Sequence, residues 1–415
     1  MQYWESNLRC PSCKGKIKII ESSIHCEECH STFSMAHGVP CFVDHVLSEH
    51  QKSDLESVRK GLAKGRSTAR LLGADARCYK WATEWVNEST VHESTRVICV
   101  GGSFIDDLPH VTSSFKFNVD HLVHEFIKII PEMVNTNVKH IASTSEALPF
   151  MDAYADFVYS RNSLDHVSNP IKTLIEINRV LKPEGRFLLS VYYNSSFIYS
   201  GETTVIDDDF VRNHLRNLFD VEWLEVRLSE SESVPQPPKF SLPNGNGLGW
   251  LYAVCKKNED FRPYDCEAMK GYERLTSSFH SAVYYDEKGM RRDASRFFAE
   301  VIDSKPFLKS DEMRIMYSKI RYLSANDHKG FRDLFDDFKL TNKDPFWWGI
   351  VIESSWSFMK DELQKEIDAR FSGTERAYLD RTIRGMKTRR IKDLVRRNRP
   401  IYRIVEPIYS FSKRV

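Results

Sequence analysis

The pattern that most constrains the fold of this chain is a strand–helix–strand unit within residues 144–193. Short apolar runs rich in β-formers, at 156–160 and 186–193, have the composition of fully buried strands. Between them, apolar residues recur at helical spacing after Pro170, and proline is favoured at the first helical position. The segment 182–185, Lys-Pro-Glu-Gly, is expected to end the helix and turn the chain. A crossover of this kind is the building unit of a parallel sheet.

Further strands are expected on either side of this unit. An apolar run at 97–100 leads into Gly101 and Gly102, and a second at 115–119 ends in Asp120, nineteen residues after Gly101. Two late strands are expected at 221–228 and 250–256, separated by a long loop rich in Ser, Pro, Gly and Asn. The whole stretch 96–257 therefore predicts an α/β domain.

These motifs resemble the class I S-adenosylmethionine (SAM) dependent methyltransferases. The resemblance implies a Rossmann-like sheet of seven strands and a glycine-rich turn where the backbone passes close to the methionine part of SAM. It implies that Asp120 binds the ribose hydroxyls. The residues expected to bind the cofactor on this resemblance are Gly101, Gly102, Ser103, Asp120, Thr144, Ser145, Leu148 and Asn162.

The glycine-rich turn departs from the family pattern. Cys99 stands where the family has an acidic residue, and Ser103 and Ile105 stand where later glycines are common. Thr144 occupies the position of an acid that often faces the adenine amine. These departures leave open a domain that has lost catalysis and serves as a scaffold for partners.

Polar residues follow the fourth and fifth strands, at the carboxyl edge where open α/β sheets bind ligands. His166 is the candidate general base, with Asp165 beside it, because the pKa of histidine lies near working pH. The alternative is that both residues cap or orient the next helix. Aromatic and polar residues that are candidates to line the acceptor pocket or to close over the cofactor are Tyr192, Tyr193, Asn194, Tyr79 and Trp81.

The first 45 residues predict a structural zinc site. The spacing Cys10-x2-Cys13 and Cys26-x2-Cys29 is typical of two knuckles that place four thiolates around Zn²⁺. Four cysteines complete a closed site, so nearby histidines are left out and Cys41 is interpreted as a small strand residue. The segment resembles the zinc ribbon that precedes some class I methyltransferases, including certain ribosomal RNA guanine methyltransferases.

A chain of 415 residues is too long for one core. We expect the ribbon in 1–45, a helical lead-in in 46–95, the methyltransferase domain in 96–257, an all-α region in 258–386 and a basic tail in 387–415. In the all-α region, the spacing of Tyr285, Gly289, Ala294, Phe298 and Pro306 matches a tetratricopeptide helix pair, with a generic helical bundle as the alternative.

Charge is distributed unevenly along the chain. The formal net charge is +1, yet residues 381–415 hold twelve Lys and Arg against Asp393 and Glu406. A basic, amphipathic tail suits the surface of an anionic membrane, while a helix docked on the acidic body is the alternative. No apolar stretch is long enough to span a bilayer and no signal peptide is evident, so we expect a cytoplasmic protein, peripheral to the inner membrane face.

The expected function is methylation of a hydroxyl on a sugar or another small molecule, within surface-glycan synthesis. A glycan or small-molecule acceptor, an anionic membrane and a protein bound to the helical region are the expected partners. An RNA methyltransferase is the alternative that the ribbon suggests, although an acidic catalytic body disfavours nucleic acid.

Overall fold

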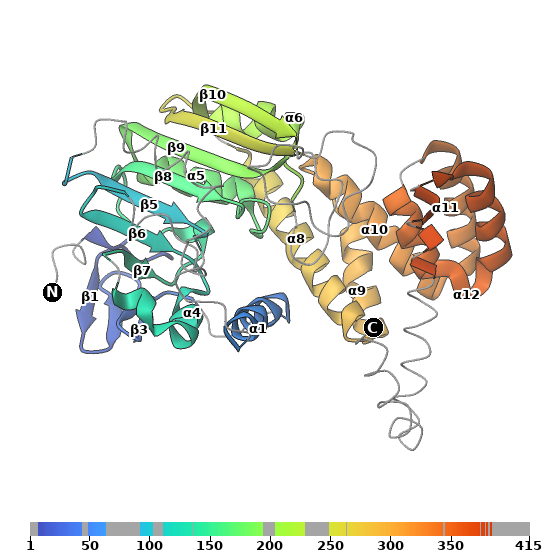
Figure 1. Ribbon diagram of the computed structural model, residues 1–415, viewed down its shortest axis with the longest axis horizontal. Coiled ribbons are helices and arrows are strands. Elements are labelled where there is room, and N and C mark those ends of the chain that lie inside the picture. The colour runs from blue at the N-terminus through green and yellow to red at the C-terminus, as the bar shows by residue number, and fades with distance from the viewer. Residues whose placement is uncertain are drawn as a thin grey trace, which may run out of the picture.

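The computed structural model is shown in Figure 1. It describes residues 7–43, 49–63, 92–102, 111–135, 137–193, 204–228, 249–262, 264–342, 345–373, 375–377, 379–380 and 382–383. Among these residues, none of the helices combines the length and the apolar character needed to cross a membrane. The expected positions of Tyr79, Trp81, Ser103, Ile105, Asn194 and the basic tail lie outside the described residues.

A seven-stranded mixed sheet forms the centre of the fold, as the sequence predicted. Its strands are β5 (Arg96–Val100), β6 (Phe115–Val119), β7 (Lys139–Ile141), β8 (Ala155–Arg161), β9 (Leu181–Tyr193), β10 (Phe219–Leu228) and β11 (Gly249–Lys257). They lie in the order β10-β11-β9-β8-β5-β6-β7. Neighbours from β7 to β9 pair in parallel, whereas β11 is antiparallel to both β9 and β10.

Helix α5 (Pro170–Val180) is the predicted crossover between β8 and β9. It begins with Asn169, whose side chain accepts a hydrogen bond from the backbone of Lys172, and with Pro170 in the first turn. Its apolar residues Ile171, Leu174 and Ile177 are buried in the main core, together with alternate residues of β9. Helix α5 thus packs its apolar face on the sheet, as the 3.6-residue spacing of its apolar side chains predicts.

The prediction of a turn at residues 182–185 is wrong in one respect, because β9 already begins at Leu181. Leu181 pairs with Ala155, and the register then shifts before Phe157 pairs with Arg186. The Lys-Pro-Glu-Gly segment is therefore an irregularity within the strand rather than a separate turn. Gly185 fits there because an added Cβ would lie 2.9 Å from the carbonyl oxygen of Lys182.

The N-terminal ribbon is a four-stranded antiparallel sheet of β1 (Ile17–Ile20), β2 (Ser23–Cys26), β3 (Thr32–Ala36) and β4 (Val39–Cys41). Figure 1 shows it beside β7, the edge strand of the large sheet. Cys41 of β4 forms a parallel bridge with Ala142, directly after β7. The ribbon thereby covers an edge that would otherwise present unpaired backbone groups.

Further helical segments lie in the described connections between these strands. They are α1 (Glu49–Ala63), α4 (Val123–Ile129), η4 (Pro131–Asn135), η5 (Ser145–Ala147), α6 (Asp208–Phe210), η6 (Val211–Leu215) and α7 (Arg216–Leu218). Helix α1 lies against α4 through Leu55 and Val58, which share a buried cluster with Val123 and Phe126. Segments α6, η6 and α7 place Phe210, Leu215 and Leu218 on the main core.

The C-terminal region is helical, as predicted, and consists of α8 (Cys266–Glu287), α9 (Arg291–Ile302), α10 (Lys309–Asn326), α11 (His328–Thr341) and α12 (Pro345–Arg370). Helices α8 and α9 form the pair with tetratricopeptide-like spacing, joined at Gly289 with φ of +73°. Ala294 and Phe298 are buried between them, and the ring of Tyr285 stacks on Phe297. In Figure 1 the helices extend from the sheet as a layer, with α11 and α12 farthest from it.

Candidate functional site

The candidate site lies at the carboxyl edge of the parallel strands. The chain leaves β5 at Gly101, β6 at Asp120 and β8 at Asn162. Because these strands are parallel and adjacent, their carboxyl ends meet at one edge of the sheet. The structure therefore brings together the residues that the sequence placed at the cofactor site after these strands.

The turn after β5 requires glycine at both described positions. Gly101 has a φ of +73°, and an added Cβ would lie 2.3 Å from the Cβ of Ser163. At Gly102 an added Cβ would lie 2.4 Å from Oδ1 of Asn118 and 2.7 Å from Sγ of Cys99. The turn therefore presents backbone rather than side chains, which suits a close approach to a ligand.

Asp120 ends β6 beside this turn. Asp120 is buried, with 7% of the residue exposed, and its Oδ1 accepts a hydrogen bond of 2.7 Å from the backbone nitrogen of Leu122. The backbone nitrogen of Gly101 in turn donates to the carbonyl of Val119, over 2.8 Å. These bonds fix the carboxylate next to the glycine turn, where it fits the ribose role that the resemblance implies.

The residues after β7 are placed differently from one another. Thr144 is exposed and precedes η5, and Ser145 Oγ lies 2.9 Å from Oγ1 of Thr173 on α5. Leu148 is fully buried in the main core, and its carbonyl accepts hydrogen bonds from Lys14 and Arg179. The roles of Thr144, Ser145 and Leu148 at the cofactor site stay predictions.

The residues after β8 adopt a strained turn. Asn162 has a φ of +43°, a conformation that asparagine tolerates better than most residues. Its backbone nitrogen donates to the carbonyl of Ser190 over 2.7 Å, and its Oδ1 is buried without a hydrogen-bond partner among the described residues. Ser163, which is not among the expected cofactor residues, donates to the carbonyl of Val100 and fills the space beside Gly101. Strain and an unsatisfied polar atom at one turn are typical of ligand sites.

Asp165 and His166 lie together in the loop that follows. Oδ1 of Asp165 is 3.7 Å from Nε2 of His166, whose side chain is partly exposed while Asp165 is buried. Burial raises the pKa of the Asp165 carboxyl, and the neighbouring His166 opposes this shift. Neither residue caps α5, because Asn169 does so. The arrangement suits an exposed imidazole oriented by a buried carboxyl group.

The two candidate tyrosines at the end of β9 differ in environment. The ring of Tyr192 packs on Trp250 of β11, with 4.4 Å between the ring centroids. The hydroxyl of Tyr193 donates to Asp208, and burial together with this carboxylate raises the pKa of Tyr193. Tyr192 and Tyr193 therefore both have packing or structural partners, and their role at an acceptor pocket stays a prediction.

A buried polar pair on the sheet was not predicted. Nδ2 of Asn118 on β6 donates to Nδ1 of His140 on β7 over 3.4 Å, and Nε2 of His140 donates to the carbonyl of Met133 over 3.1 Å. Burial lowers the pKa of His140 to about 4, so the histidine is neutral at physiological pH. Asn118 also contacts the glycine turn at Gly102. The sequence signal that could have indicated this pair is a polar residue within each of two otherwise apolar strands.

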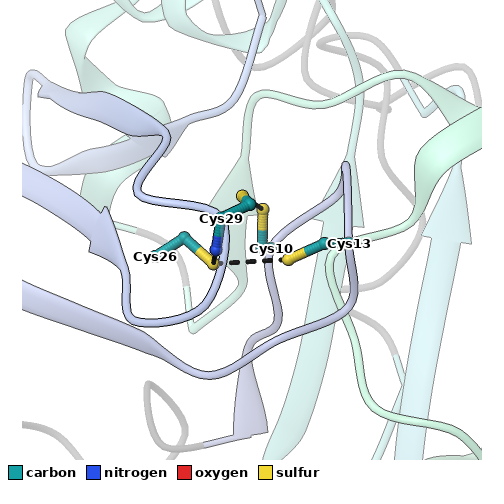
Figure 2. Close-up of side chains that lie close together, drawn as sticks. All are labelled: Cys10, Cys13, Cys26 and Cys29. Atoms are coloured by element: carbon teal, nitrogen blue, oxygen red, sulfur yellow. Dashed lines mark hydrogen bonds between the residues drawn. The ribbon is translucent and has the colours of Figure 1, made fainter.

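The four cysteines of the ribbon converge, as predicted. Figure 2 shows the side chains of Cys10, Cys13, Cys26 and Cys29 pointing toward one another from the two knuckles. Their Sγ atoms all lie within 4.8 Å of one another, with 3.4 Å between Cys13 and Cys26 and 3.6 Å between Cys10 and Cys29. Backbone nitrogens of Gly15 and Cys29 donate to sulfurs of Cys13 and Cys26. Four convergent sulfurs with backbone donors fit a structural Zn²⁺. Cys41, left out of the site, is buried on β4.

Comparison with known proteins finds similarity in the central part of the chain. Residues 119–189 match a family model described as a methyltransferase domain. The uncharacterized methyltransferase YcgJ of Bacillus subtilis is 33% identical over 137 residues, which are 33% of this chain and 46% of the relative. The chain thus spans about half the length of this curated relative.

Similar solved structures cover about half of the chain at low identity. A complex of the Haloferax volcanii Trm112 methyltransferase activator with a putative methyltransferase is 19% identical, with a TM-score of 0.36, and covers 50% of this chain and 100% of that one. The 1,6-didemethyltoxoflavin-N1-methyltransferase of Burkholderia thailandensis, with bound 1,6-didemethyltoxoflavin and S-adenosylhomocysteine, is 17% identical, with a TM-score of 0.33. It covers 57% of this chain and 100% of that one.

Proposed function

We propose that this chain, which contains a class I SAM-dependent methyltransferase domain, transfers a methyl group from SAM to a hydroxyl of a sugar or another small molecule. The family match and the relative support the methyltransferase part of the proposal. The hydroxyl acceptor rests on the site residues, and the glycan context rests on the helical region and basic tail.

The observation that carries the proposal is the pairing of a glycine turn with an acid at the ends of β5 and β6. Gly101 and Gly102 exclude side chains from the turn, and Asp120 lies at the end of the adjacent strand with its backbone nitrogen bonded to Ile141. These residues fit the methionine and ribose parts of SAM. The turn would hold the methionine part through backbone groups, and the carboxylate of Asp120 would accept hydrogen bonds from the ribose hydroxyls.

Bound SAM supplies an activated methyl group and its own leaving group, so little acid–base chemistry is left to the protein. The chain must hold the acceptor in line and take the proton of its hydroxyl. His166 would accept that proton, because it is partly exposed and its Nε2 lies 3.7 Å from a carboxylate oxygen of Asp165. A negative Asp165 would favour the imidazolium that results.

The test is calorimetric titration of the zinc-loaded full chain with SAM and with S-adenosylhomocysteine. We expect micromolar dissociation constants, followed by transfer of a labelled methyl group to members of a panel of sugars and nucleotides. Absence of binding at millimolar SAM would contradict the proposal and would favour a partner-binding scaffold. Methyl transfer to RNA and not to small molecules would support SAM as the cofactor but would contradict the proposed class of acceptor.

A further inference from the structure

We propose that the zinc ribbon is part of the cofactor site, with Lys14 as a positioning residue that couples zinc binding to SAM binding. The segment that it positions is 142–151, which carries Thr144 and Ser145. This inference rests on the proposed function, since it concerns the wall of that same site. The main observation that supports the inference is that this segment is bonded to the ribbon.

The ribbon holds the segment at its start. Backbone nitrogen of Ala142 donates to the carbonyl of Pro40 over 2.9 Å, and the nitrogen of Phe42 donates to the carbonyl of Ala142 over 2.7 Å. Ala142 follows β7 immediately, so the point at which the chain leaves the sheet is fixed by β4 of the ribbon.

The ribbon also holds the end of the segment. Leu8 and Phe150 form an antiparallel bridge. The nitrogen of Arg9 donates to the carbonyl of Pro149 over 3.0 Å, and the nitrogen of Met151 donates to the carbonyl of Asn7 over 3.3 Å. Because both ends of the segment are bonded to the ribbon, residues 143–148 have little freedom to move independently of the ribbon.

Lys14 adds a side-chain contact near the centre of the segment. Its Nζ lies 2.8 Å from Oε2 of Glu176 on α5 and 3.5 Å from the carbonyl oxygen of Leu148. Arg179 reaches the same carbonyl from α5 over 2.9 Å and forms an ion pair with Glu176. The carbonyl of Leu148 is thus held by one cation from the ribbon and one from the large domain.

The charges of this network are mutually dependent. Burial disfavours the charged form of Glu176, yet hydrogen bonds and charge interactions from Arg179 and Lys14 hold the pKa of this carboxyl below its usual value. A displaced Lys14 would leave Glu176 with one cation and the Leu148 carbonyl with one donor.

The position of Lys14 depends on the cysteine site. Lys14 follows Cys13 directly, has a φ of +63°, and donates its backbone hydrogen to the carbonyl of Cys10 over 2.8 Å. It therefore lies inside the turn of the first knuckle. Bonds from Zn²⁺ to the four sulfurs would tie the two knuckles together, so zinc removal should open this turn. If zinc raises the affinity of the protein for SAM by holding segment 142–151 in place, SAM must raise the affinity for zinc by the same factor, because the coupling between two binding sites is reciprocal.

The experiment compares Lys14→Met with Lys18→Met, a matched change at an exposed lysine of β1. Amide hydrogen exchange is measured on the zinc-loaded full chains and on the wild-type chain after chelation. We expect faster exchange in residues 142–151 for Lys14→Met and for the chelated protein, with the Lys18→Met chain unchanged. Equal protection in all four samples would overturn the inference, whether or not SAM binds.

The second arm measures S-adenosylhomocysteine binding by the same proteins, well below their unfolding temperatures. We expect the dissociation constant to rise roughly fivefold or more in Lys14→Met, with recovery in Lys14→Arg and no change in Lys18→Met. The ligand should also slow zinc release to a chelator. A Lys14→Met chain that is less stable but binds equally well would show a structural role only and overturn the inference. Failure of the wild-type, zinc-loaded chain to bind would contradict the proposed function instead.

Discussion

Gly101 and Ser163 lie so close that a Cβ atom on Gly101 would be 2.3 Å from the Cβ of Ser163. The two residues belong to turns that follow neighbouring strands, β5 and β8, and the hydroxyl of Ser163 donates to the carbonyl of Val100 over 3.1 Å. The glycine turn is therefore packed against the turn that leads to Asp165 and His166. A change at Gly101 should disturb both parts of the site.

We expect Gly101→Ala to lower the free energy of unfolding by about 2–5 kcal/mol, from a positive φ and from overpacking against Ser163. Gly38→Ala is the control, because Gly38 has a similar φ of +76° and an added Cβ there meets no atom within 4 Å. It should cost only about 1–2 kcal/mol. Chemical denaturation of both variants gives the comparison, and equal losses would contradict the packing at Ser163.

A second prediction concerns Asp120. Asparagine can still accept the hydrogen bond from Leu122 that Asp120 accepts now, so Asp120→Asn should keep the fold. Its affinity for S-adenosylhomocysteine should fall about tenfold or more, since hydrogen bonds to charged groups contribute about 1.5–3 kcal/mol. Asp120→Ala should abolish binding and also lose the bond to Leu122. Unchanged affinity in calorimetry would disprove the ribose contact.

The sheet could be predicted because its strands and α5 carry local signals. Buried parallel strands read as apolar runs, and Pro170 with helical spacing marks α5. The start of β9 at Leu181 was missed because Lys-Pro-Glu-Gly has the composition of a turn, and pairing with Ala155 overrides that local preference. Long-range pairing of this kind leaves no mark in the neighbouring sequence.

The site was predicted less completely for a related reason. Gly101, Asp120 and the four cysteines belong to motifs with fixed spacing. Lys14 and Glu176, whose charged groups lie 2.8 Å apart, are separated by 162 positions and belong to no motif. The contacts of Ser163 and Asn118 with the glycine turn likewise depend on the packing of separate strands.

Acid should destabilise the protein through His140. Its pKa is lowered by burial from 6.5 to about 4, so the folded state binds a proton less readily than the unfolded chain. The stability that the neutral ring provides is complete above pH 6.5 and is lost as the pH falls toward 4. This difference in pKa corresponds to about 3 kcal/mol.

His140→Gln tests this prediction, because glutamine can donate to the carbonyl of Met133 without taking up a proton. Between pH 6.5 and 4, its unfolding free energy should fall less steeply than that of the wild type, although His214 and His280, with pKa lowered by burial to about 4, still contribute. His92→Gln, at an exposed histidine, should keep the wild-type slope. Parallel slopes for all three chains would show that His140 is not the group that titrates.

The basic tail, which lies outside the described residues, gives a prediction from sequence alone. Removal of residues 387–415 takes away ten Lys and Arg against Asp393 and Glu406. We expect weaker binding to vesicles of anionic lipid, because each basic residue near such a surface contributes about 1 kcal/mol. The affinity for S-adenosylhomocysteine should not change. Equal vesicle binding in sedimentation assays would favour a tail that docks on the acidic body.

The last prediction concerns Arg314 of α10, which joins the helical region to the loop that carries Asp165 and His166. Its guanidinium is fully buried, forms an ion pair with Asp311 and lies 3.4 Å from Oγ1 of Thr204. The backbone nitrogen of Thr204 donates to the carbonyl of Asp165 over 3.1 Å. Arg314 therefore supports the loop that carries the candidate base. It does so from α10, a helix that lies outside the methyltransferase domain predicted from the sequence.

Arg314→Met should cost about 3–5 kcal/mol, because it leaves the carboxylate of Asp311 buried without its cation. The double variant Asp311→Asn, Arg314→Met should recover part of this loss, since no unpaired charge remains. The backbone nitrogens of Phe307 and Leu308 donate to Asp311 in the wild type and can donate to the asparagine as well. Denaturation of the single and double variants measures the difference. A double variant no more stable than Arg314→Met would show that Arg314 acts through its contact with Thr204 rather than by neutralising Asp311.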